Sequence, residues 1–357
     1  MSGIGISPCP PFNRRNLVPG VLYDGNTAAW YKHNDPIGCV YDGANRVSVW
    51  KDKLNYSASP SFFPMPMNFM DAAWTIAGTA VKVDNDSYTS AAAADGLRNV
   101  NLLWTAARYY RLRIRINITA GQLFILGDWN NANTYWNYTG TGAFENIDVT
   151  IYCNAIGING LWFRNSGAAN VDIEYCYIEM LNGNNLYQIT AGNQPTYNAA
   201  NGVLFDGVND YLKALPFVFV QPEMIYFVGR QITWLNQDGI FDGNLVQGLF
   251  YQNGVSPAVS IYGGVAFGAD INMILNTFVI VRVLFNGLNS SLQINNNAVA
   301  IGNAGASNMS GFTLGARATP AQYSNVQVKE IILRRIADNA ATQTSIYNYL
   351  KIVNAVP

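Results

Sequence analysis

The acidic residues Asp172, Glu174 and Glu179 form the grouping in this chain that comes closest to a catalytic carboxylate pair. Glycoside hydrolases place two carboxylates on either side of a glycosidic bond. Because side chains alternate along a strand, Asp172 and Glu174 would share one face and Glu179 would point to the other. We therefore interpret all three as solvated charges and predict that the chain is not an enzyme. A glycan-degrading hydrolase is the alternative.

Nucleophilic and zinc chemistry lack the side chains that they require. The one histidine, His33, stands in a turn-like stretch, and we predict a surface position with no catalytic partner. The four cysteines show no CxxC spacing, so no zinc site is expected; they are Cys9, Cys39, Cys153 and Cys176. Reduced thiols are the default prediction. Cys153 and Cys176 lie in neighbouring strand-like segments and would be able to pair under oxidising conditions.

Calcium is the cofactor that the Asp- and Asn-containing loops would suit, because Ca²⁺ binds carboxylate, amide and backbone oxygens. Candidate ligands are Asp206, Asn209 and Asp210, with a second set at Asp84, Asn85 and Asp86. Both sets are equally typical of turns, since Asp and Asn side chains accept hydrogen bonds from nearby backbone amides. Calcium and a plain turn therefore both remain open at each place.

Aromatic and amide side chains alternate in the stretch 128–138, which has a loop-like composition. Aromatic rings stack on sugar faces while Asn and Asp bond hydroxyl groups. The candidate glycan-binding residues are Trp129, Asn131, Tyr135, Trp136 and Tyr138. Trp and Tyr are also enriched at subunit interfaces, and we slightly favour that interpretation. The stretch 232–238 is a second candidate, although Trp234 suits a core position as well.

Composition limits the partners. The chain of 357 residues is 50% hydrophobic and 12% charged, with a formal net charge of -1. The absence of a basic field argues against nucleic acid, and no apolar run reaches the length of a membrane span. So few repelling charges favour packing against copies of the same chain, so a homo-oligomer is expected.

Residues 1–20, which are rich in Pro and Gly, predict an extended arm that is either frayed or docked on a neighbour. They lack the features of a signal peptide.

Strand periodicity dominates from Val21 onward. In Arg111–Ile118 arginines alternate with aliphatic residues, which predicts a half-buried strand. Val279–Phe285 and Ser291–Ile294 flank the turn signal Asn286-Gly287 and predict a hairpin. Helical spacing occurs only near the end, where Asp338 is predicted to cap a segment running to Val353. The fold class is therefore all-β with one short C-terminal helix.

Residues 184–357 resemble concanavalin A-like or laminin-G-like domains of phage and bacterial surface proteins. The resemblance rests on Gln194–Tyr197, Gly202–Leu212, Phe285–Gly287, Ile294–Asn295, Gly311–Arg317, Val328–Leu333 and Tyr347–Leu350. An opening of the same family type occurs much earlier, at Ala29–Tyr31 and Val47–Lys53. The resemblance therefore implies that an independent module interrupts one sandwich. We predict a sandwich from residues 21–56 plus 182–357, and an inserted module at 57–181.

The insert resembles jelly-roll modules of the carbohydrate-binding type. The segments that carry this resemblance are Ala73–Ala80, Tyr109–Ile116, Ile147–Cys153, Leu161–Phe163 and Val171–Ile173. Insertion at a loop is thermodynamically cheap, because loop-closure entropy grows slowly with length. The fold prediction is thus two β-sandwiches, one nested in the other, although consecutive modules remain an alternative.

These resemblances imply a virion structural protein with lectin-like folds, such as a phage head fibre, decoration or tail-associated subunit assembled in the host cytoplasm. A homo-oligomer, for instance a trimer, would supply avidity for weak host-glycan sites, and the N-terminal arm would contact other virion proteins. The alternative is a dedicated glycan-binding adhesin or receptor-binding protein.

Overall fold

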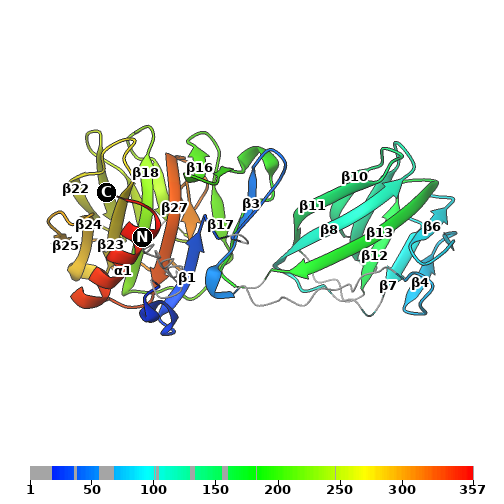
Figure 1. Ribbon diagram of the computed structural model, residues 1–357, viewed down its shortest axis with the longest axis horizontal. Helices are drawn as coiled ribbons and strands as arrows, with labels where there is room; N and C mark the ends of the chain where they lie inside the picture. The colour runs from blue at the N-terminus through cyan, green and yellow to red at the C-terminus, as the bar shows by residue number, and fades with distance from the viewer. Residues whose placement is uncertain are drawn as a thin grey trace, which may run out of the picture. The chain divides into compact units, whose positions relative to one another are not determined.

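The computed structural model describes residues 18–35, 38–55, 68–99, 101, 104–128, 133–154, 160–181, 183–245 and 247–356. The chain divides into two compact units, drawn in Figure 1. The terminal unit comprises the described parts of Met1–Gly38, Asp52–Leu54 and Pro195–Pro357, and the middle unit those of Cys39–Lys51 and Asn55–Gln194. The predicted borders after residues 56 and 181 stay predictions, and the predicted arm lies almost wholly outside the described residues.

The terminal unit contains two antiparallel sheets. The first runs in the order β15 (Thr196–Asn198), β16 (Gly202–Asp206), β27 (Asn325–Arg334), β18 (Glu223–Gln231), β23 (Val279–Phe285), β24 (Ser290–Ile294) and β25 (Ala300–Gly302), with β1 (Thr27–Lys32) also paired to β27. The second runs in the order β17 (Leu212–Ala214), β26 (Thr313–Leu314), β19 (Gly239–Asp242), β20 (Leu249–Gln252), β21 (Ala258–Tyr262) and β22 (Ala266–Asn272). Short 3-10 turns are η2 (Gly20–Tyr23) and η5 (Gly287–Asn289). The predicted hairpin is confirmed, because β23 pairs with β24 across the Asn286-Gly287 turn.

The first sheet is covered on both faces. Tyr226 and Val228 of β18 belong to the core cluster that holds the buried side of α1 (Ala340–Val353), including Leu350. Phe227, which points the other way, contacts Phe241 of the second sheet with ring centroids 6.1 Å apart. Burial on both faces explains why β18 is an almost continuous apolar run. The predicted C-terminal helix is confirmed.

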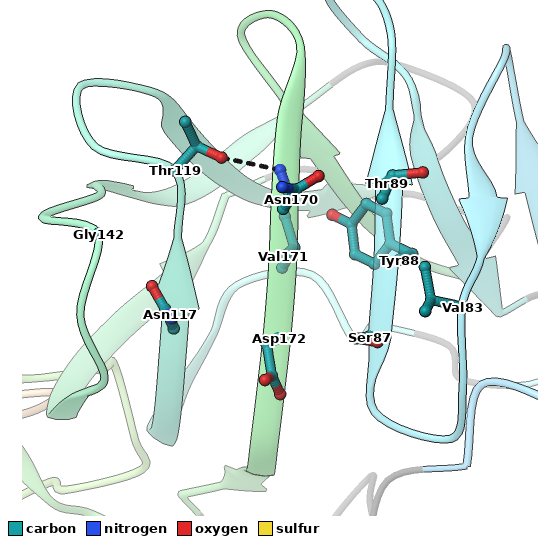
Figure 2. A pocket seen from close by; sticks show the side chains of 10 residues that line it. All are labelled: Val83, Ser87, Tyr88, Thr89, Asn117, Thr119, Gly142, Asn170, Val171 and Asp172. Carbon is teal, nitrogen blue, oxygen red and sulfur yellow. Dashed lines mark hydrogen bonds between the residues drawn. The ribbon is translucent and has the colours of Figure 1, made fainter.

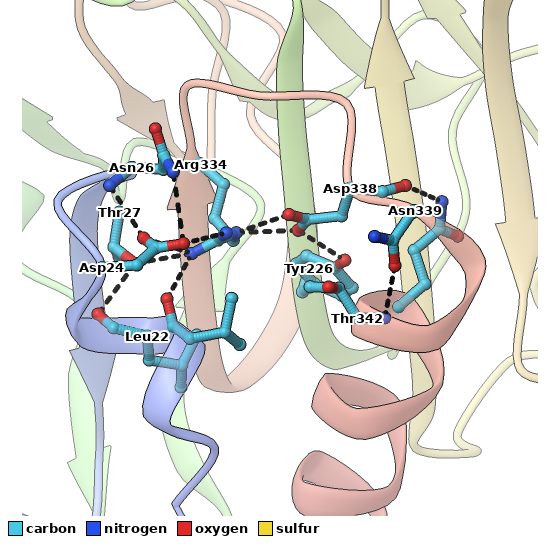
Figure 3. Close-up of polar contacts among 11 residues, drawn as sticks. Leu22, Asp24, Asn26, Thr27, Tyr226, Arg334, Asp338, Asn339 and Thr342 are labelled. Atoms are coloured by element: carbon cyan, nitrogen blue, oxygen red, sulfur yellow. Dashed lines mark hydrogen bonds and ion pairs between the residues drawn. The ribbon is translucent and has the colours of Figure 1, made fainter.

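The helix cap differs from the prediction. Asn339, not Asp338, is the N-cap of α1, and its side chain accepts a hydrogen bond of 2.9 Å from the Thr342 N–H. Asp338 instead accepts hydrogen bonds from Arg334 Nε and from the Tyr226 hydroxyl, as Figure 3 shows. A buried arginine attracts a carboxylate more strongly than a helix terminus does, so the neighbouring amide takes the capping role.

Arg334 is the centre of a buried polar cluster, with a side chain only 1% exposed. Its Nε is 2.7 Å from Asp338 Oδ2, and its Nη2 is 3.0 Å from Asp24 Oδ2. Its Nη1 donates to the carbonyl of Val21 and to the hydroxyl of Thr27. Burial alone would raise the pKa of Asp24, but the bonds from Arg334 and neighbouring amides lower it. The cluster joins the N-terminal η2–β1 segment to the end of β27.

His33 is not at the surface, which corrects the prediction. It is 4% exposed, and its Nδ1 lies 2.9 Å from the Lys329 carbonyl oxygen. Burial lowers the pKa of its imidazole. The backbone N–H of His33 also donates to the Lys329 carbonyl. These two bonds hold the turn that begins at His33 against β27. The turn chemistry was therefore correct, and the exposure was wrong.

The middle unit contains a sandwich of two five-stranded sheets. One, the β8 sheet, has the order β11 (Glu145–Cys153), β8 (Arg108–Ile118), β13 (Ala169–Met180), β6 (Ser87–Ser90) and β5 (Val81–Lys82). The other, the β9 sheet, has the order β10 (Thr134–Thr139), β9 (Leu123–Asp128), β12 (Leu161–Asn165), β7 (Gly96–Asn99) and β4 (Trp74–Ala77). The unit also holds η4 (Ala191–Asn193) and the paired strands β2 (Cys39–Tyr41), β3 (Val47–Trp50) and β14 (Leu186–Tyr187), while η3 (Lys53–Asn55) bridges the division. The predicted all-β class, with sandwiches and one C-terminal helix, is confirmed.

The inner face of β8 builds the core of the middle unit. Leu112, Ile114 and Ile116 are fully buried, and they pack with Phe124 and Phe163 from the β9 sheet. The arginines between them point outward, where Arg111 pairs with Asp148 and Arg115 with Glu174. The predicted alternation of arginines and aliphatic residues is confirmed. The outward face of this sheet is therefore polar.

The two cysteines predicted to lie in neighbouring strands do not. β8 lies between β11, which carries Cys153, and β13, which carries Cys176. Cys153 stands opposite Arg108 and Cys176 opposite Ile114, six positions apart along β8. Neither forms a disulfide, since bridging requires Cα atoms within about 7 Å. Within the described part of the chain, no helix combines the length and the apolar character that a membrane crossing requires.

Candidate functional site

The predicted aromatic site is only partly described. Trp129 and Asn131 lie outside the described residues, while Tyr135, Trp136 and Tyr138 lie on β10. This strand stands at the end of the β9 sheet and pairs with β9. The three rings are partly buried against the core of the middle unit. Their placement favours a packing role over an exposed sugar platform, and the glycan and interface assignments both stay predictions.

The side chain of Tyr135 is fixed by both a hydrogen bond and a ring contact. Its hydroxyl donates to Asp128 Oδ2 at 2.5 Å, and its ring contacts Trp104 with centroids 4.8 Å apart. Burial and the neighbouring Asp128 carboxylate raise the pKa of the phenol. Trp136 and Tyr138 stack at 6.0 Å, and Trp136 meets Phe124 edge to face. A bulge beside Tyr135 brings it to the inner side with Trp136, which simple alternation would forbid.

The second aromatic stretch, residues 232–238, makes its contacts within the terminal unit. The indole N–H of Trp234 donates to the Ala258 carbonyl at 2.9 Å, and Trp234 is only partly exposed. Asp238 is buried, and its burial raises its pKa to about 6. Trp234 is thus anchored to the edge of β21 but is half-buried, so the binding and core interpretations both stay predictions.

The calcium candidates Asp206, Asn209 and Asp210 form a self-contained turn. Asp206 Oδ1 accepts from the N–H groups of Val208 at 2.8 Å and Asn209 at 3.3 Å. Asp210 Oδ2 accepts from the Asp206 N–H at 3.1 Å. Burial, and then the nearby charge of Asp206, raises the pKa of Asp210 to about 6. These bonds to backbone amides are typical of an Asx turn, and the calcium assignment stays a prediction. Among the described residues there is no group of three or more His, Cys, Asp or Glu placed to hold a metal.

Six polar side chains stand in two rows on the outward face of the β8 sheet. We call them the polar grid: Ser87 and Thr89 on β6, Asn170 and Asp172 on β13, and Asn117 and Thr119 on and just after β8. Asp172 pairs with Ser87 on one side and with Asn117 on the other. Asn170 pairs with Thr89, and its N–H donates to Thr119 Oγ1 at 2.9 Å. Cross-strand pairing thus brings together residues from three distant parts of the sequence.

A cavity of about 510 Å³ opens over this grid. All six grid residues line it, together with Val83, Tyr88, Gly142 and Val171. Figure 2 shows Asn170 and Asp172 on the central strand, with Asn117 and Thr119 on one side and β6 on the other. Gly142, with φ of +82°, forms part of the rim where a side chain would be strained. The volume falls within the range of small-molecule sites.

Four of the six grid side chains are available to a ligand, whereas Thr119 Oγ1 already accepts from the Asn170 N–H. Within the described residues, the side chains of Thr89, Asn117, Asn170 and Asp172 make no hydrogen bond or ion pair to other protein groups. Ser87 differs, because its hydroxyl donates to Asp84 Oδ1. Hydroxyl, amide and carboxylate groups on rigid strands offer both donors and acceptors at fixed spacing. Such an array is suited to a ligand rich in hydroxyl groups.

Asp172 is one of several acidic groups at one end of the cavity. The Ile173 N–H donates to the Asp86 carbonyl at 2.8 Å, which fixes the 84–86 turn beside β13. Burial, then the charges of Asp84 and Glu174, raises the pKa of Asp172. Burial and the neighbouring Asp84 raise the pKa of Asp86 as well. Hydrogen bonds from Ser87 and Asp86 lower the pKa of Asp84.

A bulge in β13 changes the predicted position of Glu179. The register shifts between Ile173 and Tyr175, after which Glu179 stands opposite Arg111. Because Asp172 stands opposite Asn117, an outward residue of the same parity on β8, Glu179 shares the outward face after all. The two carboxylates are separated by six positions along β8, about 20 Å. Glu174 lies closer to Asp172 but is bonded to Arg115.

Sequence reasoning missed the polar grid. The signal was three polar-apolar-polar triplets, each with a buried centre: Ser87-Tyr88-Thr89, Asn117-Ile118-Thr119 and Asn170-Val171-Asp172. Each triplet by itself is an ordinary half-exposed strand. Only the register, which pairs all three side by side, makes them one surface.

No family model matches this sequence, and no curated protein matches it. Similar solved structures include a Trypanosoma rangeli sialidase in complex with sialic acid, at 8% identity and a TM-score of 0.35, covering 75% of this chain and 60% of that one. Another is the CBM22-1–CBM22-2 tandem domain of Paenibacillus barcinonensis Xyn10C, at 11% identity and a TM-score of 0.33, covering 78% and 99%. The chain spans 28% of a Trypanosoma rangeli sialidase mutant displaying trans-sialidase activity, at 14% identity and a TM-score of 0.28. These values are too low for the similarities to support a conclusion about function.

Proposed function

We propose that this chain is a non-enzymatic, glycan-binding structural protein, and that the polar grid of the middle unit is its glycan site. The observation that carries the proposal is the cavity of about 510 Å³ lined by the unpartnered side chains of Thr89, Asn117, Asn170 and Asp172. Sugars present many hydroxyl groups, each able to donate and accept, and the grid offers the complementary groups. Neighbouring grid side chains are about 5 Å apart across strands and about 7 Å apart along them.

Rigidity supports the same proposal. The grid residues stand on β6, β8 and β13, whose opposite faces carry the fully buried Tyr88, Ile118 and Ile173. Strand-borne groups lose little conformational freedom on binding, because the backbone is already fixed. Weak single sites of this kind suit a protein that displays many copies.

The direct test is glycan-array binding of the wild type and of the double variant Asn117→Ala, Asn170→Ala. We expect the wild type to bind a defined set of oligosaccharides and the double variant to lose at least tenfold in affinity, since about 1 kcal/mol per hydrogen bond is removed. The control is Asn154→Ala, an exposed amide that follows β11 and lies outside the cavity lining. Binding that survives the double variant unchanged would remove the grid as the site.

The place of the protein in a virion is part of the proposal. The sparse charge, 12% of residues with a net charge of -1, favours close packing of copies. We propose a homo-oligomer, a trimer being the simplest form, on the surface of a phage particle, with the N-terminal arm contacting other virion proteins. Light scattering on the full chain and on a chain lacking residues 1–20 tests this. A monomer in both cases would contradict the assembly and leave a free-standing binding protein.

A further inference from the structure

Among the described residues that line the cavity there is no Lys or Arg to balance the acidic groups. Asp172 lines the cavity, and Asp84 and Asp86 stand in the turn next to it. Within the described residues, none of the three takes part in an ion pair. The backbone bond between Ile173 and Asp86 holds this turn against β13, so the carboxylates cannot easily move apart.

The basic side chains on the adjoining strands are already committed. Arg115, the next outward residue on β8 after Asn117, is bonded to Glu174. Lys82 on β5 donates its ammonium protons to the carbonyls of Trp74 and Asp71, on the side of the β9 sheet. The cavity is therefore a polar site in a net negative field, with no guanidinium or ammonium group directed into it from these strands.

We infer that the cavity selects uncharged saccharides and rejects sugars that carry a carboxylate, such as sialic and uronic acids. The inference rests on the proposed glycan-binding function and deepens it by naming the ligand class. A carboxylate entering beside Asp172 would meet like charge in a partly desolvated site, with no donor cation to offset it. The hydroxyl groups of a neutral sugar would instead donate to the Asp172 carboxylate and bond Asn117 and Asn170.

Burial, and after it the neighbouring negative charge, raises the pKa values of Asp86 and Asp172. A further anion would add to that repulsion. Charge of this kind is screened by salt when the site is open to solvent. Selectivity against acidic sugars should therefore weaken as ionic strength rises, while affinity for neutral sugars should change little.

The test compares matched pairs of probes that differ in carboxylate content: galactotetraose with tetragalacturonate, and mannotetraose with tetramannuronate. Lactose and sialyllactose are added to test a sialic acid, although they also differ by one whole sugar. Binding of the wild-type chain to immobilised probes is measured at low and high salt. We expect the neutral member of a bound pair to bind at least tenfold more tightly at low salt, with a smaller ratio at high salt. The Asp86→Asn variant, which removes a charge outside the cavity lining, should reduce the ratio roughly fivefold.

The outcomes separate the two proposals. Asp71→Asn, an exposed carboxylate near β4, is the matched control and should leave the ratio unchanged. Equal or tighter binding of the acidic members would overturn the inference and leave the proposed function in place. No binding of the wild type to any probe, or to the wider array, would overturn the proposed function and the inference together. An unchanged ratio in Asp86→Asn would also overturn the electrostatic basis.

Discussion

The Arg334 cluster of the terminal unit and the polar grid of the middle unit use polar side chains in opposite ways. Arg334 is 1% exposed, and its nitrogens bond Asp24, Asp338, Thr27 and a backbone carbonyl. In the grid, the side chains of Asn117, Asn170 and Asp172 are partly or wholly exposed and bond no other protein group that the structure describes. A fully bonded buried ion fixes the local arrangement of the fold, whereas unbonded groups over a cavity remain available for a ligand.

The largest effect is expected from Arg334→Met. The substitution leaves Asp24 and Asp338 without their shared cation, and Asp338 is only 2% exposed. Breaking a buried ion pair on one side costs about 3–5 kcal/mol. Calorimetric unfolding of the full chain should show one transition moved to markedly lower temperature. Arg335→Met, at the exposed neighbouring position, is the control. Equal losses of stability in both variants would mean that the buried cluster contributes no more than an exposed arginine does.

The next largest effect is a dependence of stability on pH, which distinguishes the buried carboxyl group of Glu223 from the half-buried carboxyl group of Asp172 in the grid. Glu223 is fully buried, and its burial raises its pKa from 4.5 to about 8, although the Met309 N–H bonds it. A raised folded pKa means that its stabilising contribution is present below pH 4.5 and is lost as the pH rises toward 8, at about 1.4 kcal/mol per pH unit.

Glu223→Gln keeps the acceptor for Met309 and removes this dependence. Asp210 and Asp242, whose pKa values burial raises to about 6, titrate at lower pH, so the variant and the wild type are compared between pH 6.5 and 8 by urea unfolding. We expect the wild type to lose stability there and the variant to lose much less. Parallel curves would contradict the assignment to Glu223.

A smaller loss of stability is expected from Tyr135→Phe, a variant that distinguishes the role of the aromatic strand β10 from that of the polar grid. The change removes the hydrogen bond to the fully buried Asp128 and should cost about 1–2 kcal/mol. Glycan binding should be unaffected, because Tyr135 does not line the cavity. Selective loss of binding with normal stability would move the site back to the aromatic stretch.

The smallest change in stability should come from the grid itself. Asn117→Ala with Asn170→Ala removes side chains that bond no described protein group, so the free energy of unfolding should shift by only about 0.5 kcal/mol or less. Thermal unfolding of the full chain, measured together with the binding assay, checks this. A loss of several kcal/mol would show that the grid is structural, like the Arg334 cluster.

Local patterns identified most elements correctly. The alternation in β8, the hairpin of β23 and β24 and the helix α1 follow from side-chain periodicity and turn residues, which act over a few neighbours. Exposure was harder to predict. His33 is buried because a strand almost 300 residues later packs on it, and Glu179 changed faces because of a bulge that alternation does not contain.

The sequence by itself determined the all-β class, the polar outward face of β8 and the terminal helix, because each depends on the period of apolar residues along one segment. The tertiary structure alone decided which polar side chains line one cavity. Ser87, Asn117 and Asp172 become neighbours only through the strand order β6, β13, β8 and its register. Register is fixed by the packing of whole sheets, which buries Tyr88, Ile118 and Ile173 on the inner face and thereby directs the grid residues outward.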